Sequence, residues 1–305
     1  MSDTSDDMEA GAALYEAHLE ELERKRKQER NGQMTTTRNT MPPPPAPVAR
    51  KKVAFGEIAK AAGHRVVLYG PGGIGKTTLA ANAPGPVAFI DLDESLPRLR
   101  GALEATGAAR NIRPVAGIET WAALREALQS DGWDGIRTIA IDTLTRAEEL
   151  CVIHTLETVP HEKGHRVQRL EDYGYGKGFT HVYDVFLPIL ADLDRHCRAG
   201  RNVVLICHDC TTTVPNPAGE DWLRYEPRLQ SPASGKASIR LRVREWADHV
   251  LFYGYDVAVT KDGKGVGSGS RTIYPAELPH CMAKSRTCGE PIPVTEADVL
   301  AQIIN

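Results

Sequence analysis

The sequence lacks any hydrophobic run of the roughly 18 residues that a membrane-spanning helix needs. Its first residues, MSDTSDDMEAG, are acidic and do not follow the basic-then-apolar layout of a secretory signal. We therefore expect a cytoplasmic protein with no membrane partner. In that compartment the six cysteines are expected to be reduced thiols rather than a disulfide framework.

An excess of basic residues is also absent. The chain has 37 Lys and Arg against 40 Asp and Glu, a formal net charge of −3. Proteins that bind nucleic acid over a broad surface usually carry a strongly basic footprint. A nucleic-acid partner must therefore be argued from local features of this sequence and not from its overall charge.

The 305 residues divide into a tail, residues 1–51, and one large domain, residues 52–305. In the tail, Met8–Arg30 has apolar residues near helical spacing, which predicts a short helix that is either merely solvated or dedicated to a partner. The prolines at positions 42–45 and 47 favour an extended conformation and predict a linker.

From residue 52 onward, short apolar runs alternate with helical patterns. This alternation predicts an α/β domain with a mostly parallel sheet flanked by helices. The predicted strands are Arg65–Tyr69, Pro86–Ile90, Thr138–Ile141, Asn202–Ile206 and His249–Tyr253. The predicted helices are Lys76–Ala83, Thr120–Ser130, Thr145–Leu156 and Tyr183–Arg198. A turn-rich stretch, KDGKGVGSGS, predicts a β-hairpin within Val257–Tyr274.

The strongest motif is GPGGIGKT, which follows an apolar strand and precedes a helix. It fits the phosphate-binding loop G-x-x-x-x-G-K-[ST], in which backbone N–H groups cradle phosphate oxygens. Lys76 would reach the β- and γ-phosphates of ATP, and the Thr77 hydroxyl would bind Mg²⁺. The expected nucleotide-binding residues are Gly70, Pro71, Gly72, Gly73, Ile74, Gly75, Lys76, Thr77 and Thr78.

Two acidic segments follow buried strands and should lie beside this loop. The first is Asp142, which ends the strand IRTIAID and is the expected second magnesium ligand. The other is Asp93, next to Glu94, which could orient or deprotonate the attacking water. In an alternative interpretation Glu94 caps a helix that begins near Ser95.

These segments together resemble a known group. AFIDLDESL is similar to the segment of RecA recombinases that carries the catalytic acid, and residues 53–294 resemble the compact RecA-like ATPases of phages that act in recombination or single-strand annealing. The resemblance implies a RecA-like P-loop NTPase core that hydrolyses ATP, in the cytoplasm of a bacterial host. Asp93 aligns with a family glutamate and is one methylene shorter.

The resemblance also assigns partners and further residues. His208, which follows the strand GRNVVLIC, lies where the family places a polar γ-phosphate sensor. Single-stranded DNA would bind the basic run after it, although the same run could be a helix with Ile239, Val243, Trp246 and Val250 facing inward. The expected DNA-binding residues are Lys236, Arg240, Arg242 and Arg244.

The segment Met282–Arg286 is similar to the A-K-x-R element of RecA and DnaB-like assemblies. That likeness implies that Lys284 and Arg286 act on the γ-phosphate of a neighbouring subunit in a ring or filament of identical chains. A single-strand-binding protein is a further candidate partner, for which the tail could be the binding segment.

Other interpretations of the sequence stand beside this one. The chain could be a nucleotide-dependent switch that recruits a replication protein without productive hydrolysis, or a small-molecule kinase, although no acceptor pocket or arginine-rich lid is identifiable. Tyr173–Phe179, in which aromatic residues and glycines alternate, is either a loop between helices or a platform on which bases stack.

Overall fold

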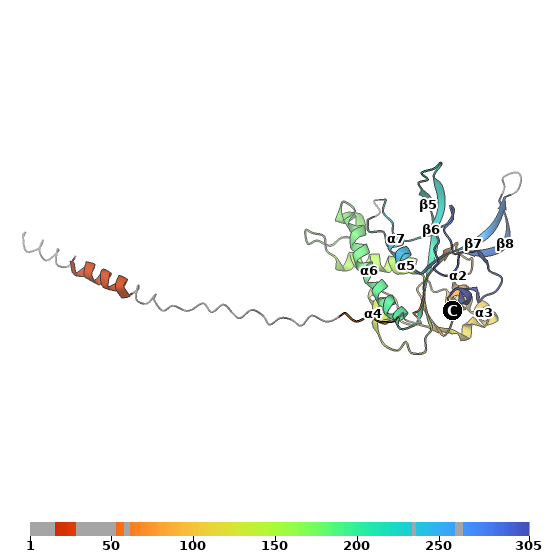
Figure 1. Ribbon diagram of the computed structural model, residues 1–305, viewed down its shortest axis with the longest axis horizontal. Coiled ribbons are helices and arrows are strands. Elements are labelled where there is room, and N and C mark those ends of the chain that lie inside the picture. Colours follow the sequence, from red (N-terminus) through yellow and green to blue (C-terminus); the bar gives the residue numbers. More distant parts are fainter. Residues whose placement is uncertain (1–15, 29–52, 58–61, 234–235, 260–264, 305) are drawn as a thin grey trace, which may run out of the picture. The chain divides into compact units, whose positions relative to one another are not determined.

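The computed structural model describes residues 16–28, 53–57, 62–233, 236–259 and 265–304. The chain divides into two compact units, residues 1–57 and residues 58–305. In the first unit, residues 16–28 form an exposed helix with an ion pair between Lys25 and Glu21 (Figure 1). The remainder of the expected tail, including the proline-rich linker, lies outside the described residues.

The second unit is built on one sheet. Within the described residues its strands follow the order β3-β2-β4-β5-β1-β7-β8-β9, and β6 pairs with β5 outside this path. The six strands from β3 to β7 are all parallel, whereas β8, β9 and β6 pair antiparallel with their neighbours. This architecture confirms the predicted α/β class, a mostly parallel sheet flanked by helices with a hairpin near the carboxyl end.

The bounds of the elements are as follows. The strands are β1 (Arg65–Gly70), β2 (Val87–Asp91), β3 (Ile112–Pro114), β4 (Thr138–Asp142), β5 (Asn202–Val214), β6 (Trp222–Pro227), β7 (His249–Val259), β8 (Gly265–Tyr274) and β9 (Ile292–Pro293). The α-helices are α2 (Lys76–Ala81), α3 (Leu96–Ala105), α4 (Trp121–Gln129), α5 (Leu144–Thr158), α6 (Lys177–Arg198), α7 (Ile239–Trp246) and α8 (Val299–Ile303). Two 3₁₀ turns are η1 (Ala108–Arg110) and η2 (Leu170–Tyr173).

The central strands are uniformly apolar because helices cover both faces of the sheet. One core cluster joins the sheet to side chains of α4, α5, α6 and α7, and a second joins its other face to α2, η1 and α8 (Figure 1). Trp121, Tyr69 and Phe186 are the bulkiest fully buried side chains of the first cluster. None of the described helices is both long and apolar enough to cross a lipid bilayer.

All five predicted strands and all four predicted helices are present, and the described residues contain further elements, among them β3, β6, β9, α3 and α8. Strand β5 continues eight residues past Ile206 to Val214 and pairs antiparallel with β6, so this strand leaves the parallel sheet as a hairpin. The hairpin predicted within 257–274 is formed by β7 and β8, and its tip, residues 260–264, lies outside the described residues.

The side chain of Asn202, at the start of β5, connects the first and last segments of the second unit. The Asn202 side-chain oxygen accepts a hydrogen bond from the backbone N–H of His64 at 2.9 Å, and its Nδ2 donates to the carbonyl of Ile304 at 3.4 Å. Only 7% of the Asn202 surface is exposed. Because water cannot easily replace either partner, this side chain stabilises the amino-terminal edge of the sheet.

Replacing Asn202 with Ala is expected to lower the free energy of unfolding by about 1–3 kcal/mol, since it leaves a buried N–H and a buried carbonyl without partners. Urea unfolding would measure the change. Gln168→Ala, at an exposed amide side chain, is the control and should change stability by less than about 0.5 kcal/mol. Equal effects of the two substitutions would contradict the proposed role of Asn202.

Candidate active site

The phosphate-binding loop leaves the carboxyl end of β1, and α2 begins at Lys76. Gly73 and Gly75 adopt positive φ angles of 76° and 106°, a backbone conformation that side chains disfavour. The Lys76 ammonium donates hydrogen bonds to the carbonyls of Gly70 at 2.6 Å and Pro71 at 2.8 Å. Burial lowers the pKa of Lys76, with nearby carboxylates opposing the shift. The predicted loop is therefore formed and holds its lysine inside the site.

Asp142 lies beside this loop, as predicted. The Thr77 hydroxyl donates to Asp142 Oδ2 at 2.7 Å, and the Ser95 hydroxyl lies 3.3 Å from the same oxygen. Burial raises the pKa of Asp142 to about 6, and the neighbouring carboxylates of Asp93 and Asp91 add to the shift. The two residues predicted to hold the metal thus face each other, and Ser95 is a third oxygen that the sequence did not indicate.

Asp93 and His208 meet on the other side of the cavity. His208 Nε2, on β5, lies 3.5 Å from Asp93 Oδ2, in the turn that follows β2. The pKa of Asp93 is lowered chiefly by its contact with His208, and the Thr143 hydroxyl lowers it further. A carboxylate with a lowered pKa is a weak base, so Asp93 is better suited to orient a water molecule than to deprotonate it.

The loop, the acids and His208 enclose one cavity of about 350 Å³, a size typical of small-ligand sites. Arg98 and Leu99, on the first turn of α3, form a part of its wall that contains no predicted residue. Prediction missed these two residues because α3 itself was not predicted beyond a possible start near Ser95. The cavity is lined by Gly72, Gly73, Gly75, Lys76, Thr77, Thr78, Asp93, Ser95, Arg98, Leu99, Asp142, Thr143 and His208.

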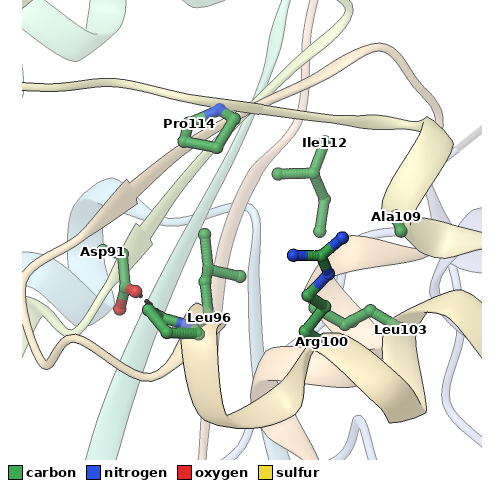
Figure 2. A pocket seen from close by; sticks show the side chains of 8 residues that line it. Asp91, Leu96, Arg100, Leu103, Ala109, Ile112 and Pro114 are labelled. Atoms are coloured by element: carbon green, nitrogen blue, oxygen red, sulfur yellow. Dashed lines mark hydrogen bonds between the residues drawn. The ribbon is translucent and has the colours of Figure 1, made fainter.

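Asp91 does not line this cavity. Its carboxylate accepts hydrogen bonds from the backbone N–H groups of Ser95 at 2.9 Å and Leu96 at 2.8 Å, so it caps α3. Figure 2 shows Asp91 directed at Leu96, on the rim of a second, mostly apolar cavity of about 360 Å³. The interpretation of Glu94 as the helix cap is therefore wrong, because Asp91 fills that role. Glu94 is exposed, has a φ of 53° and does not line the nucleotide cavity.

The donor atoms fit a magnesium ion. Thr77, Asp142 and Ser95 present only oxygen atoms, which hard divalent cations prefer, and the cavity is wide enough for phosphates that would complete the coordination. When bound, Mg²⁺ would neutralise charge on the phosphate oxygens. In such a site Lys76 would contact the phosphates, Asp93 would face the attacking water, and His208 would orient Asp93.

Residues 62–287 match the AAA_24 family, described as an AAA domain. The chain belongs to this family. The match spans the phosphate-binding loop, both acidic strands and His208, so the family core contains the entire cavity. A comparison with curated proteins gives no match.

Solved structures with similar folds include a KaiC-like protein of Pyrococcus horikoshii OT3, with 15% identity over 78% of this chain and 88% of that one, and a TM-score of 0.43. The RadB recombinase has 13% identity over 70% and 80% of the two chains, and a TM-score of 0.38. The accessory protein FlaH of Methanocaldococcus jannaschii has 9% identity over 70% and 78%, and a TM-score of 0.35. Such distant likeness carries no argument about function.

The fold of this AAA-domain chain follows from its own strand order. Strand β5, which pairs with β1 as far as His208, separates the loop strand β1 from the Asp142 strand β4, and β2 lies beyond β4. This is the arrangement expected of a RecA-like P-loop NTPase. The chain is thus a P-loop ATPase family member whose nucleotide site lies at the carboxyl edge of the parallel strands.

The basic run of this AAA-domain chain forms helix α7, with Ile239 and Val243 buried. Arg240 also points inward, where it pairs with Glu226, and Arg244 pairs with Glu277. Lys236 and Arg242 are exposed. The helix of the alternative interpretation is therefore present, with Trp246 half-buried at its end, whereas Val250 is buried in β7 and not in the helix. Arg240 is withdrawn from the DNA-binding set because its charge is neutralised inside the protein.

Lys284 and Arg286 lie far from the chain's own nucleotide site. Lys284 Nζ donates to the carbonyls of Arg244 at 3.0 Å and Ala247 at 2.6 Å, so it caps the carboxyl end of α7. Arg286 pairs with Asp248 at 3.0 Å, just before β7 begins, and 65% of its side chain is exposed. Since β7 runs parallel to β1, Arg286 lies near the edge opposite the phosphate loop.

Asp142→Asn is expected to stabilise the metal-free protein at pH 8 by about 1–3 kcal/mol, because it removes a buried charge whose pKa is raised to about 6. A carboxyl pKa raised from about 4 to about 6 means that wild-type stability falls as pH rises from about 4 to about 6 and is constant above that range. The gain should therefore be about half as large at pH 5 and vanish only below about pH 4. Thermal unfolding without Mg²⁺ at these pH values would measure it, with exposed Asp131→Asn as the control. A gain that does not depend on pH would contradict the assignment.

Proposed function

We propose that this chain hydrolyses ATP with Mg²⁺ and acts on single-stranded DNA in recombination or annealing, as a ring or filament of identical subunits. The observation that carries the proposal is the convergence of Lys76, Asp142, Asp93 and His208 on one cavity at the carboxyl edge of the sheet. Each of these residues has a role in phosphoryl transfer to water: phosphate binding, metal binding, water orientation and γ-phosphate sensing.

A chain of hydrogen bonds links His208 to an exposed cationic surface. The Thr145 hydroxyl contacts the N–H of His208 at 3.1 Å and the carbonyl of Arg228 at 3.3 Å, and the N–H of Arg228 donates to the His208 carbonyl at 2.8 Å. Two residues later, the N–H of Gln230 donates to Glu148. A change at His208 on nucleotide binding would therefore reach the segment that leads to α7.

The surface next to that segment suits a nucleic-acid strand. Gln230 Nε2 bridges the carbonyls of Phe179 and Ala237, which places the start of α6 beside the start of α7. Between η2 and α6, Tyr175 is fully exposed, lies between two glycines and has a φ of 49°. Exposed aromatic rings stack on bases, and nearby cations neutralise phosphates. Exposed cations in the segments that flank these helix starts are Lys163, Arg166, Arg169, Arg228, Lys236 and Arg242. Of these, Arg242 also pairs with Glu245 at 3.5 Å.

Oligomer formation would give Arg286 its role. Asp248 precedes β7 and lies opposite Arg65, five residues before Gly70, so about 17 Å of strand separates it from the chain's own phosphate loop. An exposed arginine so far from its own nucleotide site could instead contact the nucleotide that a neighbouring subunit binds. Lys284 is left out of this part of the proposal because its ammonium is held by three backbone carbonyls of its own chain.

A nucleotide-dependent switch is the second candidate. The feature that favours it is Asp93, whose lowered pKa makes it a poor base for hydrolysis. In that case ATP would alter the segment after His208 to admit a partner protein, and turnover would be negligible. Hydrolysis measurements separate the two candidates.

Steady-state ATP hydrolysis with and without single-stranded DNA is the first test. Wild type should be stimulated by DNA, and Lys76→Ala and Arg286→Ala should each lose at least about 90% of the stimulated rate, because one lacks the phosphate contact and the other the contact to its neighbour. Mixing the two inactive variants should restore part of the activity, since mixed interfaces pair an intact loop with an intact Arg286.

Failure of the mixture to recover activity would rule out a role of Arg286 between subunits. Hydrolysis that depends on Lys76 but ignores DNA would overturn the recombination proposal. ATP binding without turnover would favour the switch.

Tyr175→Ala is expected to weaken binding of a fluorescein-labelled oligothymidine by roughly five- to tenfold, because one stacked base is lost. Fluorescence anisotropy at fixed ionic strength would measure it. Phe55→Ala removes an equally exposed aromatic ring from the first unit and serves as the control. If both variants bind as wild type does, Tyr175 is no part of a DNA surface.

A further inference from the structure

The β7–β8 hairpin forms the outer wall of the phosphate-binding loop. Strand β7 pairs with β1 up to Tyr69, and a Cβ placed on Gly70 would lie 2.0 Å from the carbonyl oxygen of Tyr253. No side chain fits between the loop and β7. The first residue of the loop is therefore pressed directly against the hairpin backbone.

Arg271 extends from the second strand of that hairpin to the middle of the loop. Its Nη1 donates to the carbonyl of Ile74 at 2.8 Å, and its guanidinium lies 5.9 Å from the centre of the Tyr253 ring. A Cβ on Gly75 would come within 3.1 Å of the same nitrogen. Arg271 thus contacts the loop at the two residues that immediately precede Lys76.

The backbone of Arg271 is fixed on both sides. It pairs with Tyr255 across the hairpin, and its carbonyl accepts a hydrogen bond from the N–H of Val294 at 2.8 Å. Among the described residues, no carboxylate forms a salt bridge with Arg271. The arginine therefore brings a positive charge to the loop that no ion pair within the described residues neutralises.

The contact acts on one particular amide. The carbonyl of Ile74 and the N–H of Gly75 belong to the same peptide group, and hydrogen bonds through a shared group strengthen one another. A charged donor on the carbonyl makes the N–H a better donor. In phosphate-binding loops the N–H groups of the glycine-rich turn face the phosphates, so this polarisation would act on the bound nucleotide.

We infer that Arg271 is a positioning residue for nucleotide binding: through the Ile74 carbonyl it holds the phosphate loop in its binding conformation and strengthens the Gly75 amide as a phosphate ligand. The inference rests on the proposed nucleotide site. Because Arg271 touches the loop and not the γ-phosphate or the attacking water, it should affect ATP and ADP equally and leave the chemical step alone.

The test is equilibrium binding of ATP and ADP by Arg271→Gln and Arg271→Lys, together with kcat and the melting temperature. Arg271→Gln should weaken both nucleotides by about tenfold, the effect of losing one charge-assisted hydrogen bond, with kcat at saturating ATP within about twofold of wild type. Arg271→Lys keeps the charge and should recover part of the affinity. A purely structural residue would lower the melting temperature without this selective effect on affinity.

Arg113→Gln is the matched control. Arg113 also donates to backbone carbonyls, those of Arg110 and Ile112, but lies on the edge strand β3. The inference is wrong if Arg271→Gln binds nucleotide as tightly as Arg113→Gln, or if it weakens ATP and ADP by different factors. It is also wrong if Arg271→Gln lowers the melting temperature and Arg271→Lys restores none of the nucleotide affinity. Two other results would overturn the proposed site and the inference together. One is that the wild type binds no nucleotide, and the other is that Lys76→Ala binds nucleotide as tightly as the wild type does.

Discussion

Burial of β1 between two parallel neighbours is the constraint on which the rest of the structure depends. Val66, Val67, Leu68 and Tyr69 are entirely buried, and β5 and β7 occupy both hydrogen-bonding edges of the strand. A strand held in this way fixes the direction in which the chain emerges at Gly70. Because β5 pairs with β1 in register and β4 pairs with β5, His208 within β5 and Asp142 at the end of β4 arrive at the same edge. The nucleotide cavity is thus a consequence of strand pairing.

Charged groups at that edge are held at a cost to stability. Lys76 and Asp142 are buried, and burial favours the neutral form of each: it lowers the pKa of Lys76 and raises the pKa of Asp142. Such groups are tolerated because they meet hydrogen-bond partners, the loop carbonyls for Lys76 and the Thr77 hydroxyl for Asp142. A triphosphate with its metal brings opposite charge to both sides of this arrangement, so the site is electrostatically prepared for a ligand that carries both signs.

The sequence was informative where a local pattern determines the structure. Apolar runs located the parallel strands, and GPGGIGKT located the loop, because few other structures need those glycines next to a lysine. It was less informative where the outcome depends on contacts between distant segments. Nothing local distinguishes Arg240, paired with Glu226 inside the protein, from the exposed Arg242 two residues later. Likewise Arg271, 197 positions from Ile74, contacts the loop only because β8 folds back on β7.

The helix behind the phosphate loop has a mechanical consequence. On α2, Leu79, Ala80 and Ala81 are buried in the same core cluster as Val299, Leu300 and Ile303 of α8, so the helix is packed between the sheet and the last helix of the chain. Side chains as small as alanine leave no slack for α2 to slide or rotate. Helix α2, which follows the phosphate-binding loop, is therefore held in a fixed position. A movement coupled to nucleotide binding would therefore act on the segments that project from the carboxyl edge, the extended β5–β6 hairpin and the β7–β8 hairpin.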